Sequence, residues 1–448
     1  MLRLKTLLIQ LRSSLWFLPT LIVLGSAAFA VVFIEIDSSF SFELSNRFPR
    51  LFGAGAEGSR GMLSSIASSM ITVAGVTFSI TIVALSQAAN QYSSRILRNF
   101  MRDRANQAVL GVFLGIFTYC LLVLRAIRGA DEGDFVPSLS VFGGLVLALV
   151  AIGFLIYFIH HVASSLQASN VIAAAANETV GTIERLFPES LHEKEEDPED
   201  IAAEHTTLKD KRRITIAAPK TGYIQSHDLE AFVHLACAHQ LVLRMHAGVG
   251  DFAVFDSPIV TVYTDGPLDE ELVENVQDAY SINALRTIEQ DPRFGIRQIV
   301  DIALKALSPG VNDTTTALIC IDYLTAINVR LANKRIARPL VYQDGQLRVV
   351  AKGPTFEMFV EESFDEIRAD AAGKTKVILH LINSIKTIGG ATDSPARRYL
   401  LSKQISLLQD LTKETIHSDH DLARIKRSLD SVAALMNGPT SESGQTNS

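Results

Sequence analysis

The chain has 448 residues, of which 48% are hydrophobic, and a formal net charge of −7 at pH 7. That hydrophobic share is high for a soluble protein and low for one embedded entirely in a membrane, so the composition predicts a mixed architecture. The acidic balance argues against a nucleic acid partner.

Four stretches lack charged side chains for long enough to cross a hydrocarbon core of about 30 Å, which takes roughly 20 residues. The sequence therefore predicts a mixed membrane and soluble fold, with a four-helix transmembrane region in residues 1–161 and an α+β cytosolic domain after it. The four stretches are Ser13–Ile34, Met62–Ser94, Ala105–Leu124 and Pro137–Ile159.

The first stretch has two interpretations. Basic residues, an apolar run and Ala28-Phe29-Ala30 also fit a cleaved signal peptide, but the apolar run continues to Ile34, which favours an uncleaved span. Basic residues precede the first stretch and lie between the second and third, whereas the loop after the third is acidic. Because positively charged loops stay in the cytoplasm, we expect both termini there.

Beyond the spans, the sequence pattern changes several times. The fourth span should continue as a helix to Phe187, followed by an acidic linker. Alternating residues then predict a small β-barrel-like part with an inserted helix. A mainly helical cytosolic domain follows, with one β-hairpin at Asp344-Gly345 and helix starts at Asp291-Pro292 and Ser394-Pro395, where a capping side chain precedes proline. A disordered tail ends the chain. In order, these parts are residues 162–212, 213–266, 267–437 and 438–448.

Two segments, GYIQ and GVGDFAVFDSPIVTVY, are similar to the small sandwich-type barrels of lipoyl and biotinyl carriers. The lysine that those carriers modify at a hairpin tip is missing here. The resemblance therefore implies a small barrel without an attached cofactor.

The second span carries a stripe of small or hydroxylated residues at helical spacing, interrupted only by Ile82. Small residues let helices approach closely and hydroxyls bond between helices, so the stripe fits helix packing. In a ring of subunits the same residues would line a pore, where hydroxyls replace part of an ion's hydration shell. Both interpretations predict association through this face, and a homo-oligomer is expected. The stripe consists of Ser65, Ser68, Thr72, Gly75, Ser79 and Ser86.

No Asp, Glu, Lys, Arg or His lies inside any of the four spans. Ionisable residues at membrane depth mark proton relays and coupled transport, so a proton-driven pump is disfavoured. After the second span, Arg95, Arg98 and Arg102 share one helix face. This basic face fits a surface that binds lipid headgroups, or one that docks on the acidic soluble domain.

A proline-glycine bend separates two helical patterns in the segment ALKALSPGVNDTTTALICIDYL. Pro309 ends the first helix, Gly310 permits the bend, and Asn312 or Asp313 caps the second helix. This local chemistry predicts a helix hairpin. The free amides at the second helix start, with nearby hydroxyls and arginines, also make a candidate ligand or gating turn. That candidate comprises Arg293, Arg297, Ser308, Gly310, Asn312, Asp313 and Thr314.

The residues point to no catalytic machinery. Neither a Ser/His/Asp order with supporting turns, nor a Gly-rich phosphate loop, nor an HExxH helix occurs, so no catalytic residue and no cofactor is expected. The 3 cysteines are too widely spaced for a zinc site. Four histidines, His227, His234, His239 and His246, are close in sequence, but such scattered histidines are more often core or surface residues, and no metal site is expected.

Three segments, ITVAGVTFSITIVALSQAANQYSSRILRNFMRD, KTGYIQ and DPRFGIRQIVDIALKALSPGVNDTTTA, resemble a bacterial family of predicted membrane proteins catalogued as a domain of unknown function. The resemblance runs from about Ser13 to Asn437 and implies a multi-pass inner-membrane protein with a cytosolic domain. It implies no activity and no catalytic residues. Relatives often have proline after the Asn-Asp pair, where this chain has Thr314.

Three functions are compatible with the sequence. The stripe and the uncharged spans favour a homo-oligomeric passive channel or channel-like protein, whose cytosolic domain serves assembly or gating. A membrane-anchored sensor or scaffold, whose cytosolic domain binds a small molecule, an ion or a protein, is the alternative. A membrane-tethered enzyme is the third. In each case the lipid bilayer is the expected partner.

Overall fold

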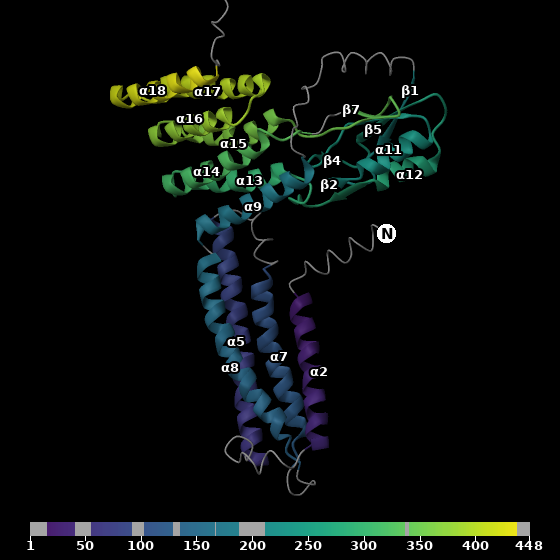
Figure 1. The fold of residues 1–448 in the computed structure, drawn as a ribbon, viewed down its shortest axis with the longest axis vertical. Coiled ribbons are helices and arrows are strands. Elements are labelled where there is room, and N and C mark those ends of the chain that lie inside the picture. The colour runs from purple at the N-terminus through teal and green to yellow at the C-terminus, as the bar shows by residue number, and fades with distance from the viewer. Residues whose placement is uncertain are drawn as a thin grey trace, which may run out of the picture. The chain divides into compact units, whose positions relative to one another are not determined.

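The computed structural model describes residues 16–40, 55–91, 103–128, 135–165, 167–187, 211–336 and 340–436. The chain divides into two compact units, here called the membrane unit (Met1–Asn170) and the soluble unit (Val171–Ser448). Figure 1 shows the helices and strands of both units. The predicted mixed architecture, in which apolar helices precede a region of helices and small sheets, is confirmed.

In its described residues, the membrane unit contains four helices long and apolar enough to span a bilayer: α2 (Phe17–Phe40), α5 (Ala56–Gln91), α7 (Arg104–Ala126) and α8 (Ser138–Ser165). α7 is the central helix, because 56% of its most apolar stretch is buried, against 11–22% in the other three. It contacts α2, α5 and α8. Phe113, Tyr119 and Cys120 of α7 are completely buried in the core of this unit.

The fourth span and the helix after it are separate, so the prediction of one continuous helix to Phe187 is wrong. α8 ends at Ser165, and the next helix, α9, spans Ala168–Leu186. The side-chain Nδ2 of Asn170 donates a hydrogen bond of 2.7 Å to the carbonyl of Ser164. This bond satisfies a backbone acceptor in the last turn of α8, which a continued helix would otherwise satisfy. Helical periodicity does not reveal such a bond.

The β part of the soluble unit has strands β1 (Arg212–Ala217), β2 (Gly222–His227), β3 (Val242–Met245), β4 (Phe252–Ala253), β5 (Pro258–Thr264), β6 (Tyr280–Asn283), β7 (Leu340–Gln343) and β8 (Gln346–Val350). They form a five-stranded sheet of order β1-β5-β3-β8-β7 and a three-stranded sheet of order β4-β2-β6. Both sheets share one core with α11 (Leu229–Ala238) and α12 (Glu270–Asp278). The barrel-like part is thus two sheets around one core, with α11 inserted between β2 and β3.

β6 is a strand in a region, Asp269 to Asn333, where the sequence pattern indicates mainly helices. Its Ile282 pairs with Ile224 of β2, and both side chains are buried. A strand of 4 residues is too short to show a clear alternation. β6 therefore depends on its long-range pairing with β2, which the local sequence does not encode.

The predicted hairpin is confirmed between β7 and β8, which pair antiparallel. Asp344 and Gly345 have φ angles of +53° and +72°. Two successive positive φ angles are the requirement of a two-residue type I′ turn. β8 also pairs in parallel with β3, which attaches the hairpin to the five-stranded sheet.

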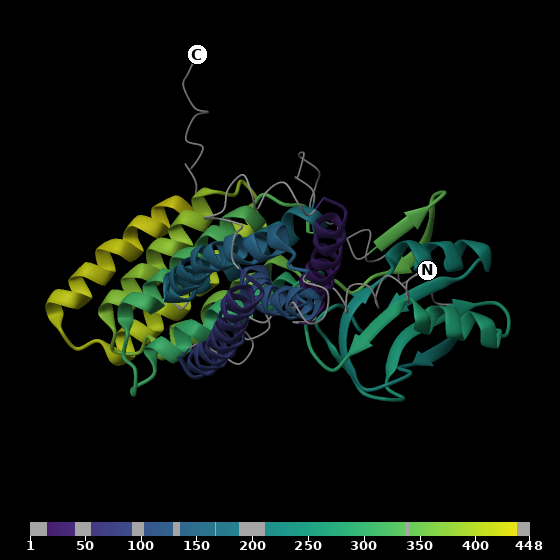
Figure 2. The same cartoon turned by 90° about the horizontal axis from the view of Figure 1, so that it is seen from below.

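The helical part of the soluble unit lies beside the β part (Figure 2). It consists of α13 (Pro292–Leu307), α14 (Thr314–Leu331), α15 (Phe356–Asp370), α16 (Thr375–Gly390), α17 (Pro395–Thr415) and α18 (Asp419–Met436). α13 contacts α14 and α15, and α16 contacts α14, α17 and α18. Asp291 and Ser394 cap α13 and α17, each followed by proline, as the sequence predicts.

α9 packs on α13 at a point where only glycine fits. A Cβ atom added to Gly295 would lie 1.9 Å from Oγ1 and 3.0 Å from Cβ of Thr179, whose side chain is completely buried. The Thr179 hydroxyl also donates to the carbonyl of Ala175 at 2.7 Å, so turning it away would break that bond. The first helix of the soluble unit is therefore held against α13 by close backbone approach.

We expect Gly295→Ala to lower the free energy of unfolding of the soluble unit by about 1–3 kcal/mol, because the added methyl group overpacks this contact. Urea unfolding of the full chain in detergent measures the loss. A second change, Thr179→Ala, removes the clashing hydroxyl and should restore part of it. Gly310→Ala is the control, since a Cβ there meets no atom within 4 Å. Equal losses for the two glycines would contradict the contact.

Candidate functional site

The hydroxyl stripe of α5 lies on the outside of the membrane unit. Every stripe residue is exposed, whereas Leu63, Ala67, Ala74 and Thr77 on the opposite face are buried. A Cβ atom on Gly75 would meet no atom of the described residues within 4 Å, so none of them requires a small residue there. Packing of α5 within the described part of one chain therefore does not account for the stripe residues Ser65, Ser68, Thr72, Gly75, Ser79 and Ser86.

Two hydroxyls of the stripe are bonded to their own helix. Ser65 Oγ donates to the carbonyl of Gly61 at 2.9 Å, and Thr72 Oγ1 donates to that of Ser68 at 2.8 Å. Each bond uses the hydroxyl proton and leaves the oxygen lone pairs as acceptors. At these positions the stripe presents acceptors rather than donors.

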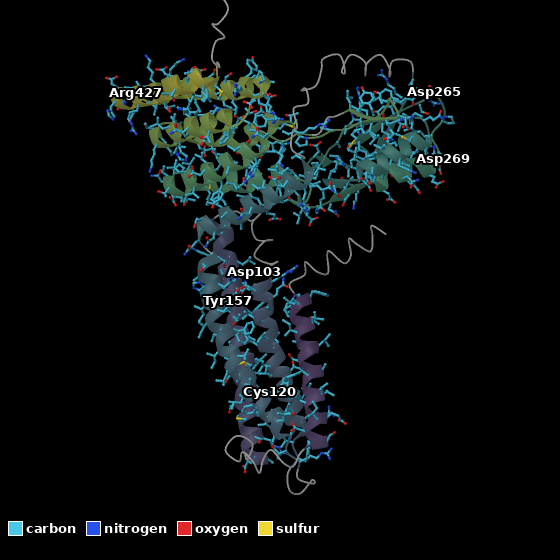
Figure 3. All side chains as sticks on the ribbon, in the orientation of Figure 1. Asp103, Cys120, Tyr157, Asp265, Asp269 and Arg427 are labelled. Atoms are coloured by element: carbon cyan, nitrogen blue, oxygen red, sulfur yellow. The ribbon has the colours of Figure 1, made fainter. Side chains whose placement is uncertain are left out.

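Asp103 joins two helices at the start of α7. Its carboxylate accepts from the amide of Ala105 at 2.9 Å and lies 2.5 Å from Nε2 of His161 in α8. The ring of Tyr157 stacks on that histidine, and Figure 3 shows Asp103 and Tyr157 toward the same end of the unit. A cavity of about 210 Å³ lies beside Asp103, between Trp16, α5 and α7. The basic face predicted nearby lies outside the described residues: Arg95, Arg98 and Arg102.

At the other end of α8, Asp37 of α2 holds the first turn in place. The carboxylate is 6% exposed and accepts from the amides of Leu139 and Ser140, at 3.0 and 2.8 Å, and from the Ser140 hydroxyl at 2.6 Å. Tyr119 of α7 donates to the Ser140 carbonyl at 2.8 Å. One buried carboxylate thereby ties α2 to α8. Sequence reasoning missed this role, and the only signal was an acidic residue just past the apolar run that ends at Ile34.

The candidate turn between α13 and α14 is a tight helix hairpin. Asn312 has a φ of +49°, and the amide of Asp313 reaches back to the carbonyl of Ala306 at 2.7 Å. Asp313 caps α14 by accepting from the amide and the hydroxyl of Thr316, at 3.0 and 2.6 Å. Thr314 is the first residue of α14, a position that proline also favours. Local hydrogen bonds therefore account for the shape of the bend, which contains Ser308, Gly310 and Asn312.

We expect Asp313→Ala to lower the free energy of unfolding by about 1 kcal/mol at neutral pH, because α14 loses its cap. Asp313→Asn should lose less, since asparagine also caps. Hydrogen bonds from Thr316 hold the pKa of Asp313 below its ordinary value, so this stabilisation is lost as the pH falls through the folded pKa. Urea unfolding at neutral and acid pH measures both effects. A penalty for Asp313→Ala that stayed constant with pH would contradict the carboxylate's role.

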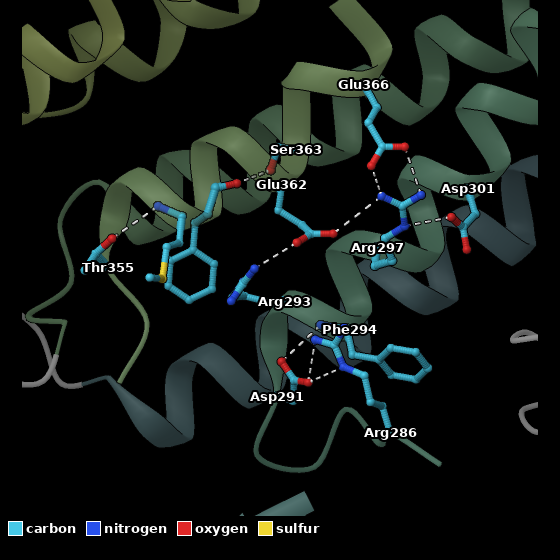
Figure 4. Close-up of polar contacts among 12 residues, drawn as sticks. Arg286, Asp291, Arg293, Phe294, Arg297, Asp301, Thr355, Glu362, Ser363 and Glu366 are labelled. Carbon is cyan, nitrogen blue, oxygen red and sulfur yellow. Dashed lines mark hydrogen bonds and ion pairs between the residues drawn. The ribbon is translucent and has the colours of Figure 1, made fainter. Parts of the chain in front are cut away.

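The two arginines of the candidate site are not brought to the turn. Arg293 bonds Glu362 of α15 at 3.0 Å (Figure 4). Arg297 bonds Asp301, four residues further along α13, at 2.8 Å and also contacts Glu366, whose hydrogen bonds raise the pKa of the guanidinium. Arg297 precedes the bend by roughly 16 Å of helix. These arginines clamp α13 to α15, and the residues of the bend lie together without them.

Figure 4 also shows a buried ion pair that sequence reasoning missed. Arg286 donates to Oδ2 of Asp291 through Nε and Nη2, at 2.8 and 2.7 Å, and Asp291 is 3% exposed. Burial raises the pKa of Asp291 despite the arginine. Gly250 has a φ of +91°, and a Cβ there would lie 2.7 Å from the carboxylate. The pair thus joins the segment after β6 to the start of α13, and the loop before β4 passes close to its carboxylate. The sequence showed only the capping role of Asp291.

The histidines take separate places in the β part. Among the described residues, no three His, Cys, Asp or Glu side chains are grouped so that they could hold a metal ion. His246 Nε2 lies 2.7 Å from the hydroxyl of Thr261. His227 lies against the rings of Phe232 and Tyr280, and burial lowers its pKa. Packing therefore accounts for the surroundings of His227.

The model of a family described as "Predicted membrane protein (DUF2254)" matches residues 12–387. The chain belongs to this family. Two relatives described as uncharacterised proteins, from Mycobacterium bovis and Mycobacterium tuberculosis, are each 30% identical over 434 residues, which cover 94% of this chain and 81% of theirs. No solved structure matches the chain. The DUF2254 match spans both the hydroxyl stripe and the helix hairpin, so the predicted resemblance is confirmed. The family description names no activity, so the chemistry of both candidate sites is argued from their residues alone.

Proposed function

We propose that the protein is a homo-oligomeric passive channel or channel-like protein of the bacterial inner membrane. In this proposal both termini lie in the cytoplasm, and the soluble unit serves assembly or gating. The supporting observation is that the whole hydroxyl stripe of α5 is exposed in a single chain. Such a face gains most from contact with another copy or with water.

The neighbouring exposed positions of α5 have a different chemistry. Ile71, Val76, Ile80 and Val83 are large, apolar and exposed, as expected of side chains in contact with lipid. The stripe runs beside them with serine, threonine and glycine. Small residues allow the backbones of two helices to approach closely, so the stripe suits contact between copies of α5.

A ring of such helices would suit cations. The hydroxyls of Ser65 and Thr72 donate to their own helix and leave oxygen lone pairs outward. Oxygen acceptors replace the hydration shell of a cation in selective pores. α5 carries no Asp, Glu, Lys, Arg or His from Gly61 to Gln87, which favours passive conduction over a proton-coupled step.

The test combines flux and mass. The full chain, reconstituted in liposomes, should pass monovalent cations, and its mass in mild detergent should be that of an oligomer. The double change Ser68→Leu and Thr72→Leu fills the stripe and should abolish both properties. Val76→Leu, an exposed position outside the stripe, is the matched control and should abolish neither. Tight vesicles that contain folded protein, or a monomer in detergent, would refute the channel.

A further inference from the structure

The soluble unit carries a compact apolar projection, here called the aromatic tip, made of Phe252, Val254 and Phe255. These side chains are 54%, 53% and 66% exposed. Among the described residues of the soluble unit, no other segment of four residues has three exposed large apolar side chains. The tip begins on β4 and ends in the turn before β5.

The three-stranded sheet extends this surface beyond the tip. Phe252 pairs with Tyr223 of β2 in register, and their rings meet edge to face at 4.9 Å. Tyr223 pairs in turn with Asn283 of β6. Leu285, just after β6, is 61% exposed, and its carbonyl accepts from Gln225 of β2. The aromatic surface therefore extends from the tip to Tyr223, and Leu285 is a second exposed apolar side chain beyond the polar Asn283 and Gln225.

The fold holds the tip in one conformation. The amide of Phe255 donates to the hydroxyl of Thr221 at 2.9 Å, and Ser257 Oγ donates to the carbonyl of Val254 at 2.6 Å. Asp256 has a φ of +66°, and its amide donates to the carbonyl of Ala218 at 3.1 Å. A left-handed residue at a non-glycine position persists only where surrounding contacts fix it. A turn fixed by these hydrogen bonds therefore holds the two rings in their exposed positions.

We propose that the aromatic tip inserts into the interfacial region of the bilayer that holds the membrane unit. Phenylalanine side chains bury at the boundary between headgroups and acyl chains, and aliphatic ones gain by leaving water. The chain supplies the proximity, because only residues 166 and 167 separate the last membrane helix, α8, from α9 of the soluble unit. The proposal does not depend on channel activity.

The area of the tip favours a bilayer over a second protein. A stable protein interface buries roughly 800 Å² on each partner. Three side chains that are about half exposed offer on the order of 300 Å². A bilayer requires no complementary shape, so each ring contributes independently. Lys220 and Asp256 lie in the two hydrogen-bonded turns beside the rings. Their opposite charges cancel, so apolar contact drives the insertion of the tip into the bilayer.

The chain contains a single tryptophan, Trp16, which permits a direct test. The full chain with Trp16→Phe and Phe255→Trp carries its only indole at the tip. It is reconstituted in vesicles of phosphatidylcholine, either plain or brominated high on the acyl chains. We expect blue-shifted emission in plain vesicles and loss of most of the intensity in brominated ones. A far-ultraviolet circular dichroism spectrum equal to that of the parent shows that the variant is folded.

The matched control is Trp16→Phe with Tyr399→Trp, because Tyr399 of α17 is an aromatic residue with similar exposure, 65%. Its emission should resemble that of indole in water and should be unaffected by bromine. Water-like, unquenched emission from residue 255 would overturn the proposal. Blue-shifted emission that bromine does not quench would also overturn it, since the tip would then lie against protein.

Discussion

Arg286→Ala is expected to lower the free energy of unfolding of the soluble unit by about 3–5 kcal/mol at neutral pH. The guanidinium is the charge partner of Asp291, whose side chain is 4% exposed. Removing it leaves a carboxylate in a buried place without its counter-charge. Gly250 on the facing loop adds no side chain that could take its place.

The loss should depend on pH in a defined direction. Burial raises the pKa of Asp291 in the folded state, so the folded protein binds more protons than the unfolded one between the two pKa values. Stability is therefore greatest below the unfolded pKa and falls as the pH rises through the folded one. Without Arg286 the folded pKa rises further, so the variant should regain part of its stability in mild acid.

Urea unfolding of the full chain in detergent, at neutral and mildly acid pH, measures this loss. Asp291→Asn in the Arg286→Ala chain removes the uncompensated charge, so it should restore stability at neutral pH and abolish the pH dependence. Lys413→Ala is the control, because its pair with Asp410 is exposed and exposed pairs contribute about 0–1 kcal/mol. A loss for Arg286→Ala as small as that of the control would refute the buried pair.

The elements predicted from sequence are those that depend on residues close together in the chain. Helix starts at Asp291 and Ser394 require a capping side chain and the following proline. The hairpin at Asp344-Gly345 requires two residues that accept positive φ. Membrane spans require only length and the absence of charge. Each of these signals is complete within about 20 residues, so the local sequence is sufficient.

Most of the features that were missed depend on residues far apart. Asp37 and Ser140 meet across 103 positions, and β6 forms on β2. The sequence placed Asp291 as a helix cap, but neither its burial nor its counter-charge has a periodic signature. In the candidate turn, the bend residues are contiguous in the chain, so the sequence could predict that they lie together. Helix spacing did not show that α15 would engage Arg293 and Arg297, because its carboxylates lie 69 positions away.

The local sequence pattern also could not predict that the hydroxyl stripe faces outward. Spacing identified one face of α5 but not which face its neighbours would cover. In the structure, α5 packs on α7 through the face that contains Leu63 and Ala67, and the stripe is left outside. A periodic stripe in a membrane helix therefore predicts a contact surface without telling whether the partner belongs to the same chain.

Asp37→Ala should have the largest effect in the membrane unit. The amides of Leu139 and Ser140 at the start of α8 lose their acceptor, and Ser140 is completely buried. An unsatisfied buried donor costs about 1–3 kcal/mol, so the buried amide and hydroxyl of Ser140 predict a loss of about 2–6 kcal/mol. The substitution weakens the packing of α2 on α8, because the Asp37 carboxylate accepts the hydrogen bonds that connect these two helices.

Titration of the full chain with sodium dodecyl sulfate in mixed micelles, followed by circular dichroism, measures this loss as a lower midpoint. Asp37→Asn keeps one acceptor oxygen, so its midpoint should fall between those of the parent and the alanine variant. Ser38→Ala changes the next residue, whose exposed hydroxyl bonds only its own helix at Glu35, and should leave the midpoint almost unchanged. If Asp37→Ala behaved like Ser38→Ala, the α8 amides would have found water, and the carboxylate would not join the two helices.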